Sequence, residues 1–250
     1  MTSAPSASRP PTVVLVHGAF AGAGSWAPVL RRLLAAGVPV RAVVNPLRGL
    51  AADAAYVAAA ISQISGPVLA VGHCYGGAII TNAVPFTTNV VGLVYVAAFA
   101  PDEGESLTEI VARSNDSLLT TAVQPSRYPS GRDTTATELI IDPARFHAVF
   151  TADLSRSESD VYAVSQRPIA AAAFEESSGP AAWRSLPVWA VVGTADHVAG
   201  SDVVRQMARR AGAAITEIDG SHLVMISQPD AVTAVVLQAL EAVTSSRSSP

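Results

Sequence analysis

The sequence predicts an α/β fold in which a mostly parallel sheet is flanked by helices. Short apolar segments alternate along the chain with segments of helical periodicity, and residues 90–99 and 187–193 are the clearest apolar ones. A strand that is apolar along its whole length is typical of a parallel sheet covered on both faces. The 250 residues, of which 50% are hydrophobic, are enough for one large core.

The expected elements follow one another in a regular order. Strands are expected over residues 12–16, 38–44, 68–72, 90–99, 187–193 and 215–218. Helices are expected over residues 26–36, 53–64, 75–84, 202–211 and 229–243. Gly37 and the Gly66-Pro67 pair end the first two helices, as such residues commonly do. Ligands of such sheets bind beyond the carboxyl ends of the strands.

Residues 101–186 interrupt this rhythm. They are richer in Asp, Glu, Ser, Thr and Pro, and they show only helical or loop patterns, at 107–119, 141–150 and 158–164. We interpret them as an α-helical lid (cap) inserted between two core strands, because long functional insertions tend to lie at the carboxyl edge. A surface elaboration without a role in binding is the alternative.

The expected domain organisation follows from these boundaries. The core comprises residues 12–100 and 187–243, and the lid comprises residues 101–186. Residues 1–11 are expected to be a disordered N-terminal segment, and the Ser-rich residues 244–250 a frayed tail.

Composition argues against several classes of function. The net charge of -4 and the pI of about 5.7 give no basic face for nucleic acid. No apolar stretch is long enough to span a membrane, and the first residues lack a signal core, so a cytoplasmic protein is expected. Cys74 is the only cysteine, so an intrachain disulfide is excluded. Metal-ligand spacings and phosphate loops are not apparent, so no metal or cofactor is expected, and the oligomeric state stays open.

The segment Gly72-His73-Cys74-Tyr75-Gly76-Gly77 lies between an expected strand and an expected helix. A Gly-x-nucleophile-x-Gly turn between a strand and a helix is a nucleophile elbow, in which flanking glycines avoid clashes at a sharp turn. The pattern therefore predicts that Cys74 is a nucleophile. The alternative is that Cys74 is simply a small buried hydrophobic residue, which is common for a lone cysteine.

Two further residues complete a catalytic order. Asp196 follows the strand 187–193, and His222 follows the strand 215–218. The order nucleophile, acid, histidine is the one that accompanies such an elbow, so we expect His222 to be the base and Asp196 its orienting acid. Asp102, after the strand 90–99, is the reserve candidate for the acid.

The loop after the first strand, His17-Gly18-Ala19-Phe20, is expected to complete the site. The backbone N–H groups of Ala19 and Tyr75 are the candidate oxyanion-hole donors. Phe20 and Trp26 are expected to wall the substrate pocket. His17 is expected to brace this loop.

These motifs, together with Gly193-Thr194-Ala195-Asp196 and Ser221-His222, carry a resemblance. The chain resembles the α/β-hydrolase superfamily over roughly residues 12–243, specifically the small cofactor-free branch similar to bacterial carboxylesterases, plant methyl-ester esterases and hydroxynitrile lyases. The resemblance implies an α/β-hydrolase fold and a catalytic triad. It predicts Ser at position 74, where this chain has Cys.

The cysteine leaves three interpretations open: a natural Cys-His-Asp catalyst, a substitution of Ser, or a relic on a binding scaffold. Our hypothesis is a hydrolase that acts on a small-molecule carboxylic ester, lactone or thioester through an acyl-enzyme on Cys74. The alternatives are a cyclase or acyltransferase with the same triad, and a non-catalytic small-molecule receptor on the same scaffold.

Overall fold

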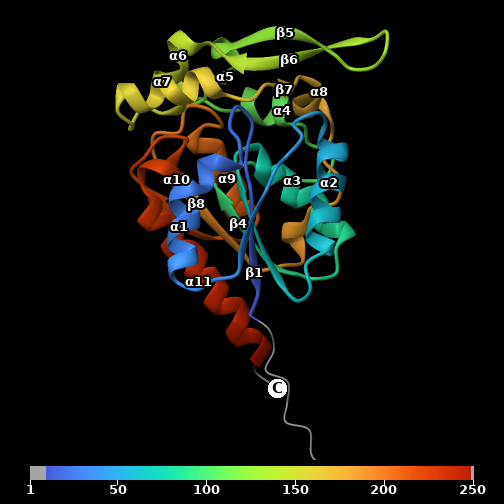
Figure 1. The fold of residues 1–250 in the computed structure, drawn as a ribbon, viewed down its shortest axis with the longest axis vertical. Helices are drawn as coiled ribbons and strands as arrows, with labels where there is room; N and C mark the ends of the chain where they lie inside the picture. Colours follow the sequence, from blue (N-terminus) through green and yellow to red (C-terminus); the bar gives the residue numbers. More distant parts are fainter. Residues whose placement is uncertain (1–9, 249–250) are drawn as a thin grey trace, which may run out of the picture.

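A six-stranded parallel sheet forms the centre of the molecule (Figure 1). The computed structural model describes residues 10–248. In spatial order, the strands are β2 (Val40–Val43), β1 (Thr12–Val16), β3 (Val68–His73), β4 (Val90–Val96), β8 (Val188–Gly193) and β9 (Ala214–Ile218). All residues of β3 and β8 are buried, as their continuous apolar sequences predict. The predicted α/β-hydrolase fold with a mostly parallel sheet is thereby confirmed.

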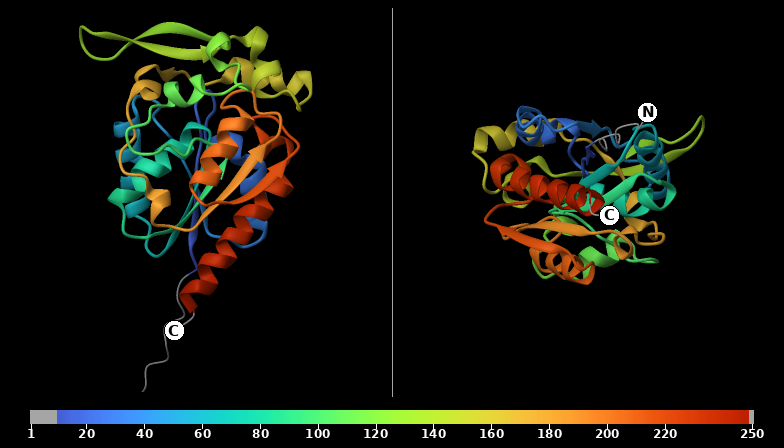
Figure 2. Two further views of the ribbon diagram at one scale, coloured as in Figure 1. Left: turned by 180° about the vertical axis from the view of Figure 1, so that it is seen from behind. Right: turned by 90° about the horizontal axis from the view of Figure 1, so that it is seen from below.

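Helices cover both faces of this sheet. The core helices are α1 (Ala27–Ala35), α2 (Leu50–Ser62), α3 (Tyr75–Ala83), α9 (Ser201–Arg210), α10 (Val224–Ser227) and α11 (Pro229–Ser248), with short 3-10 turns at Ala23–Trp26 and Val84–Phe86. Helices α1 and α11 pack against each other on one face, and α2 and α3 pack against each other on the other (Figure 2). The expected core elements are therefore present, with ends displaced by a few residues.

Residues 101–186 are called the insertion. Most of it lies above the carboxyl ends of the strands, and its last residues return along the sheet to the start of β8 (Figure 1). Their helices are α4 (Leu107–Ala112), α5 (Leu119–Ala122), α6 (Pro143–Phe150), α7 (Arg156–Ser165) and α8 (Ala172–Glu175), followed by a 3-10 turn at Ala182–Arg184. The insertion also contains a three-stranded antiparallel sheet of β5 (Val123–Pro129), β6 (Thr135–Ile141) and β7 (Ile169–Ala170). The expectation of helices and loops alone is wrong in this respect.

The β5–β6 hairpin was not predicted from the sequence, for a physical reason. Pro125 and Pro129 lie within β5, and proline removes a backbone donor from a ladder. They are tolerated because β5 is an edge strand of its sheet. Most of β5 is exposed, so it also lacks the alternation of apolar and polar residues that marks a half-buried strand.

The two ends of the chain differ from expectation in different ways. Of the expected disordered segment 1–11, residues 1–9 lie outside the described residues, and Pro10 and Pro11 lead directly into β1. The expected tail is helical through Ser248, so α11 is longer than predicted, and residues 249–250 lie outside the described residues. The Thr244 and Ser246 hydroxyls donate to carbonyls four residues earlier, which satisfies these side chains within the helix.

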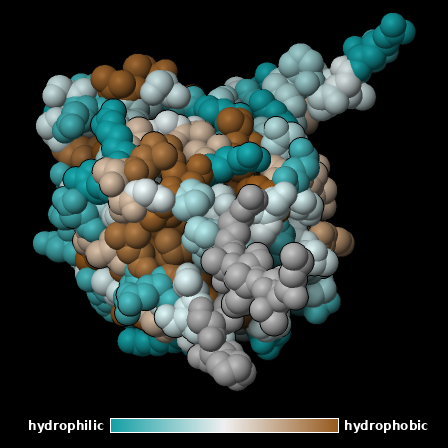
Figure 3. Space-filling view, turned by 60° about the horizontal axis from the view of Figure 1, so that its bottom comes forward, coloured by the Kyte–Doolittle hydropathy of each residue, from teal (hydrophilic) through white to brown (hydrophobic). Residues whose placement is uncertain are grey.

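The surface away from the insertion is of mixed polarity. Figure 3 brings the lower face of Figure 1 forward and shows apolar side chains gathered between hydrophilic ones. Among residues 10–248, no helix is long and apolar enough to cross a membrane.

Candidate active site

Cys74 lies between the end of β3 and the start of α3 in a conformation that side chains rarely adopt. Its φ is 53° and its ψ is -124°. Such a conformation costs on the order of 1–3 kcal/mol and persists only where the surroundings enforce it. A Cβ on Gly72 would lie 2.5 Å from the carbonyl oxygen of Gly76, and one on Gly76 would lie 2.3 Å from that of Val16. The glycines are therefore required by backbone contact, as the elbow motif predicts.

His222 and Asp196 form a buried hydrogen-bonded pair at the carboxyl edge of the sheet. The His222 Nδ1–H donates to Asp196 Oδ2 over 2.8 Å, and neither side chain is more than 1% exposed. The other carboxylate oxygen, Oδ1, accepts the backbone N–H groups of Val198 at 2.9 Å and Ala199 at 3.1 Å. Asp196 thus holds the imidazole in one tautomer, with Nδ1 protonated.

The electrostatic environment of His222 favours its imidazolium form. Burial alone would lower the pKa of His222, but the charge and hydrogen bond of Asp196, together with the nearby Cys74, raise it well above the usual value. Nε2 is buried and has no hydrogen-bond partner among residues 10–248. The ring therefore has one nitrogen bonded to Asp196 and one buried nitrogen that is available to another group.

The loop after β1 lies directly against Cys74. A Cβ on Gly18 would lie 2.3 Å from Cys74 Cβ and 3.1 Å from its sulfur. The backbone N–H of Ala19, next in this loop, and that of Tyr75 donate to no acceptor in the described part of the chain. Two free backbone donors next to Cys74 would suit the oxyanion hole that sequence analysis expects.

His17 orients one of these two donors. Its Nδ1–H donates to the Gly18 carbonyl over 2.8 Å, and this carbonyl belongs to the same peptide unit as the Ala19 N–H. Its Nε2 accepts from the Asn45 backbone at 2.9 Å and from Arg167 Nη1 at 3.0 Å. Burial and the nearby Arg167 charge lower the pKa of His17 to about 4, although the Gly18 bond opposes them. His17 is therefore neutral and braces the loop, whereas sequence analysis missed Asn45 and Arg167.

His73 supports His222 from below. Burial and the His222 charge keep the pKa of His73 well below its usual value, so the ring is neutral. Its Nε2–H donates to the His222 carbonyl over 3.0 Å, and the two ring centroids are 4.7 Å apart. Trp26 packs edge-on against His73 at 6.3 Å. Trp26 therefore lies under the elbow. This contact does not support the expectation that Trp26 walls the substrate pocket.

Phe20 contacts Phe150 and lines a small apolar cavity. Its ring meets that of Phe150 edge-on at 6.2 Å, and Phe150 packs on the His222 ring at 4.9 Å. On its other side, Phe20 lines a cavity of about 100 Å³. The other lining residues are Thr108, Val111, Leu119, Thr120, Val123, Leu139 and Phe174. The insertion therefore lines most of this cavity.

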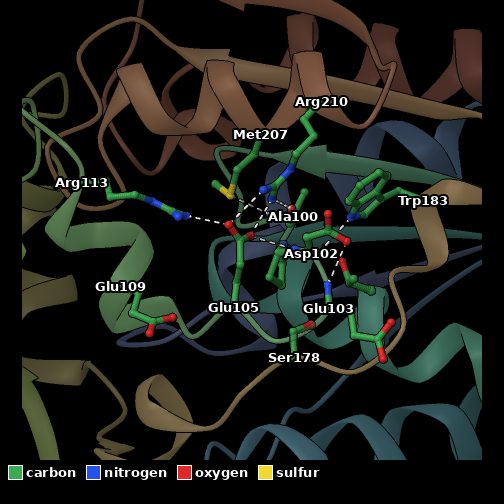
Figure 4. A network of polar contacts seen from close by, with 12 residues as sticks. Ala100, Asp102, Glu103, Glu105, Glu109, Arg113, Ser178, Trp183, Met207 and Arg210 are labelled. Atoms are coloured by element: carbon green, nitrogen blue, oxygen red, sulfur yellow. Dashed lines mark hydrogen bonds and ion pairs between the residues drawn. The ribbon is translucent and has the colours of Figure 1, made fainter.

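The reserve acid candidate lies outside this site. Asp102 forms an ion pair with Arg184. The Asp102 backbone N–H donates to Glu105 at 2.8 Å (Figure 4). His197, the neighbour of Asp196, bonds through Nδ1 to the Asp116 carbonyl at 3.1 Å. Within residues 10–248, no group of three or more His, Cys, Asp and Glu side chains could hold a metal ion.

The family assignment follows from sequence comparison. The family model described as "Alpha/beta hydrolase family" matches residues 13–235, and the chain therefore belongs to this family. No curated protein shows significant sequence similarity to the chain.

Solved structures with the same fold include several enzymes. Polyneuridine aldehyde esterase and a methylesterase from Arabidopsis each superpose with a TM-score of 0.75, at 20% identity, over 92% of this chain and 99% of theirs. A pyrethroid hydrolase from Sphingobium faniae has a TM-score of 0.74 at 20% identity, over 93% of this chain and 98% of its own. At this identity, the likeness establishes the fold.

Proposed function

We propose that the protein is an esterase-type hydrolase that forms a covalent acyl-enzyme on Cys74. The observation that carries the proposal is the buried Asp196–His222 pair, whose remaining imidazole nitrogen adjoins a cysteine on a strained strand-to-helix turn. A nucleophile, a base and an orienting carboxylate in this relation are the requirements of acyl transfer. The names of the three structural relatives, an esterase, a methylesterase and a hydrolase, agree with this class of reaction.

The proposed reaction has two halves. The Cys74 sulfur transfers its proton to His222 Nε2 and attacks the acyl carbonyl carbon, whose oxygen takes the negative charge and binds the Ala19 and Tyr75 N–H groups. His222 then protonates the leaving oxygen or sulfur, and a thioester remains on Cys74. In the second half, His222 takes a proton from water, the resulting hydroxide attacks the thioester, and the acid leaves as the proton returns to Cys74.

The raised pKa of His222 fits this sequence of steps. A histidine that favours its imidazolium form stabilises a thiolate beside it and is a ready proton donor to the leaving group. Asp196 is the largest contributor to this raised pKa. Asp196 therefore acts on both the orientation and the charge of the base.

The insertion is proposed to act as a lid over an apolar acyl site. Cys74 and His222 are both 0% exposed beneath the insertion. Side chains of the insertion line the small cavity next to Phe20. A site of this kind favours a small or medium apolar acyl group. Substrate entry then requires movement of the insertion or of Phe20.

Steady-state hydrolysis of p-nitrophenyl acetate, butyrate and octanoate tests the proposal. We expect Cys74→Ala and His222→Ala to lower kcat/KM by about 10³-fold or more, because each removes a member of the triad. His197→Ala is the matched control and should retain activity. This histidine follows Asp196 in the sequence, but its ring hydrogen-bonds to the Asp116 carbonyl and not to the Asp196 carboxylate. Wild-type turnover that survives Cys74→Ala would contradict the assignment.

A further inference from the structure

The loop that carries His222 has little regular structure of its own. It occupies residues 219–223, between the end of β9 and the start of α10. The core holds it through the His73 bond to the His222 carbonyl and through the Ala195 N–H, which donates to the Gly220 carbonyl at 3.0 Å. These contacts do not involve the backbone N–H groups of Ser221 and Leu223, the residues on either side of His222.

The insertion supplies the missing contacts. The Ser221 backbone N–H donates to Asp153 Oδ2 at 3.0 Å, and its hydroxyl donates to the other oxygen of the same carboxylate. On the other side of His222, the Leu223 N–H donates to the Phe150 carbonyl at 3.3 Å. Residues 150–153 of the insertion therefore hold both sequence neighbours of His222.

The loop is shaped to admit the Asp153 carboxylate. A Cβ on Gly220 would lie 3.1 Å from Asp153 Oδ2, so a larger residue there would crowd the carboxylate. Burial would raise the pKa of Asp153, but the hydrogen bonds from the Ser221 hydroxyl and backbone help to lower it below its usual value, so the carboxylate remains charged. A charged acceptor binds the two Ser221 donors more strongly than a neutral one would.

We infer that Asp153 is a positioning residue for the catalytic base, so that the seated insertion aligns His222. The inference rests on the proposed function. By fixing the Ser221 backbone, Asp153 sets the direction of the His222 side chain, and the Phe150 ring packs on the imidazole at 4.9 Å. A displacement of a catalytic group by about 1 Å can cost about 100-fold in rate. An insertion that moves off the core would therefore also release the base.

Asp153→Ala tests this role, with Asp160→Asn as its matched control. Asp160 is an acidic residue of α7 in the same insertion, and its ion pair with Arg156 is exposed. For Asp153→Ala, we expect kcat on p-nitrophenyl butyrate to fall about 10- to 100-fold, with KM within about twofold. The low-field proton resonance of His222 Nδ1–H, measured by NMR without substrate, should weaken or disappear, whereas Asp160→Asn should leave both readouts unchanged.

Two milder variants serve if Asp153→Ala fails to fold. Asp153→Asn keeps an oxygen acceptor for Ser221 and should lose less activity than the alanine variant. Ser221→Ala removes only the hydroxyl bond and should also give a partial loss. A graded weakening of the low-field proton across these variants supports the inference.

The outcomes separate this inference from the proposed function. Wild-type kcat and an intact low-field proton in Asp153→Ala overturn the role of Asp153, as does an equal loss in Asp160→Asn. If wild-type protein never acylates Cys74, the proposed function fails. The low-field proton still decides the role of Asp153 in that case, because it reports His222 alignment without any reaction.

Discussion

At Cys74, backbone conformation and chemistry depend on each other. The positive φ of this residue lifts the sulfur out of the strand direction, and the close approach of Gly18 and Gly76 makes the turn possible. The sequence motif predicted this turn because glycine is required where a Cβ would clash with neighbouring backbone atoms. It could not predict Asn45, Arg167 or Asp153, because their partners lie far away along the chain and their residue types are common on surfaces.

The elbow glycines offer a stability test at the residue scale. Gly76→Ala would place a Cβ 2.3 Å from the Val16 carbonyl oxygen, so the backbone must shift. We expect the free energy of unfolding to fall by about 3 kcal/mol. Gly24→Ala, where nothing lies within 4 Å of the new Cβ, should change it by less than about 0.5 kcal/mol. Urea titration of both variants measures the difference, and equal stabilities would contradict the packing argument.

Asp196 offers a test of pH dependence. It is the main group that raises the pKa of His222, so Asp196→Asn should lower that pKa. The imidazolium that protonates the leaving group would then be lost at lower pH, and the alkaline limb of the kcat/KM profile should move toward neutral pH. We also expect a fall of about 10²- to 10⁴-fold at the optimum. An unshifted alkaline limb would mean that Asp196 does not control the base.

At the scale of elements, an ion-pair network fastens the insertion to the core (Figure 4). Glu105 accepts from Arg113 at the end of α4 and from Arg210 at the end of α9, with nitrogen–oxygen distances of 2.7–2.9 Å. Burial would raise the pKa of Glu105, but Arg210, the Asp102 N–H and Arg113 lower it to about 2. The network therefore joins one helix of each part of the molecule.

The lowered pKa of Glu105 predicts a contribution to acid stability. A carboxylate with a folded-state pKa below its unfolded value of 4.5 stabilises the fold above pH 4.5. This contribution is lost as the pH falls from 4.5 toward 2. Glu105→Gln should cost about 1–3 kcal/mol at pH 7 and much less near pH 2.

Glu241→Gln, on the exposed side of α11, is the control for Glu105. It should leave the free energy of unfolding unchanged at every pH. Guanidinium titrations between pH 2 and pH 7 measure both variants. A pH-independent loss in Glu105→Gln would show that packing, and not charge, explains the effect.

Predictability from sequence also differs between elements. Strands β1, β3 and β8 were predicted almost to the residue, because strands buried on both faces are continuously apolar. The β5–β6 hairpin was missed because an exposed edge with two prolines has no such signal. Sequence periodicity reports burial, and it is therefore informative where an element is packed on the core.

At the scale of the whole molecule, the core and the hairpin of the insertion should differ in local stability. Strands β3 and β8 are buried at every residue, whereas most residues of β5 are exposed. Amide hydrogen exchange should therefore be at least about 100-fold faster in β5 and β6 than in β3 and β8. Exchange measured by mass spectrometry resolves these segments, and uniform protection would argue against a lid that opens without unfolding the core.

The fold does not by itself decide the chemistry of the site, since one scaffold hosts many reactions. The same constellation of Cys74, His222 and Asp196 would serve an acyltransferase or cyclase, if the acyl group passes to an acceptor other than water. A receptor would hold a ligand and leave the sulfur unmodified. All three catalytic possibilities begin with acyl transfer to the sulfur, whereas the receptor does not.

Acid-quenched intact-mass spectrometry after incubation with p-nitrophenyl esters is the most direct test of this shared step. The proposal predicts one added acyl group per chain, located at Cys74 by peptide mapping and absent in Cys74→Ala. The proposal is contradicted if the wild-type protein remains unmodified with every acyl group from acetyl to octanoyl, so that it cannot be distinguished from His222→Ala.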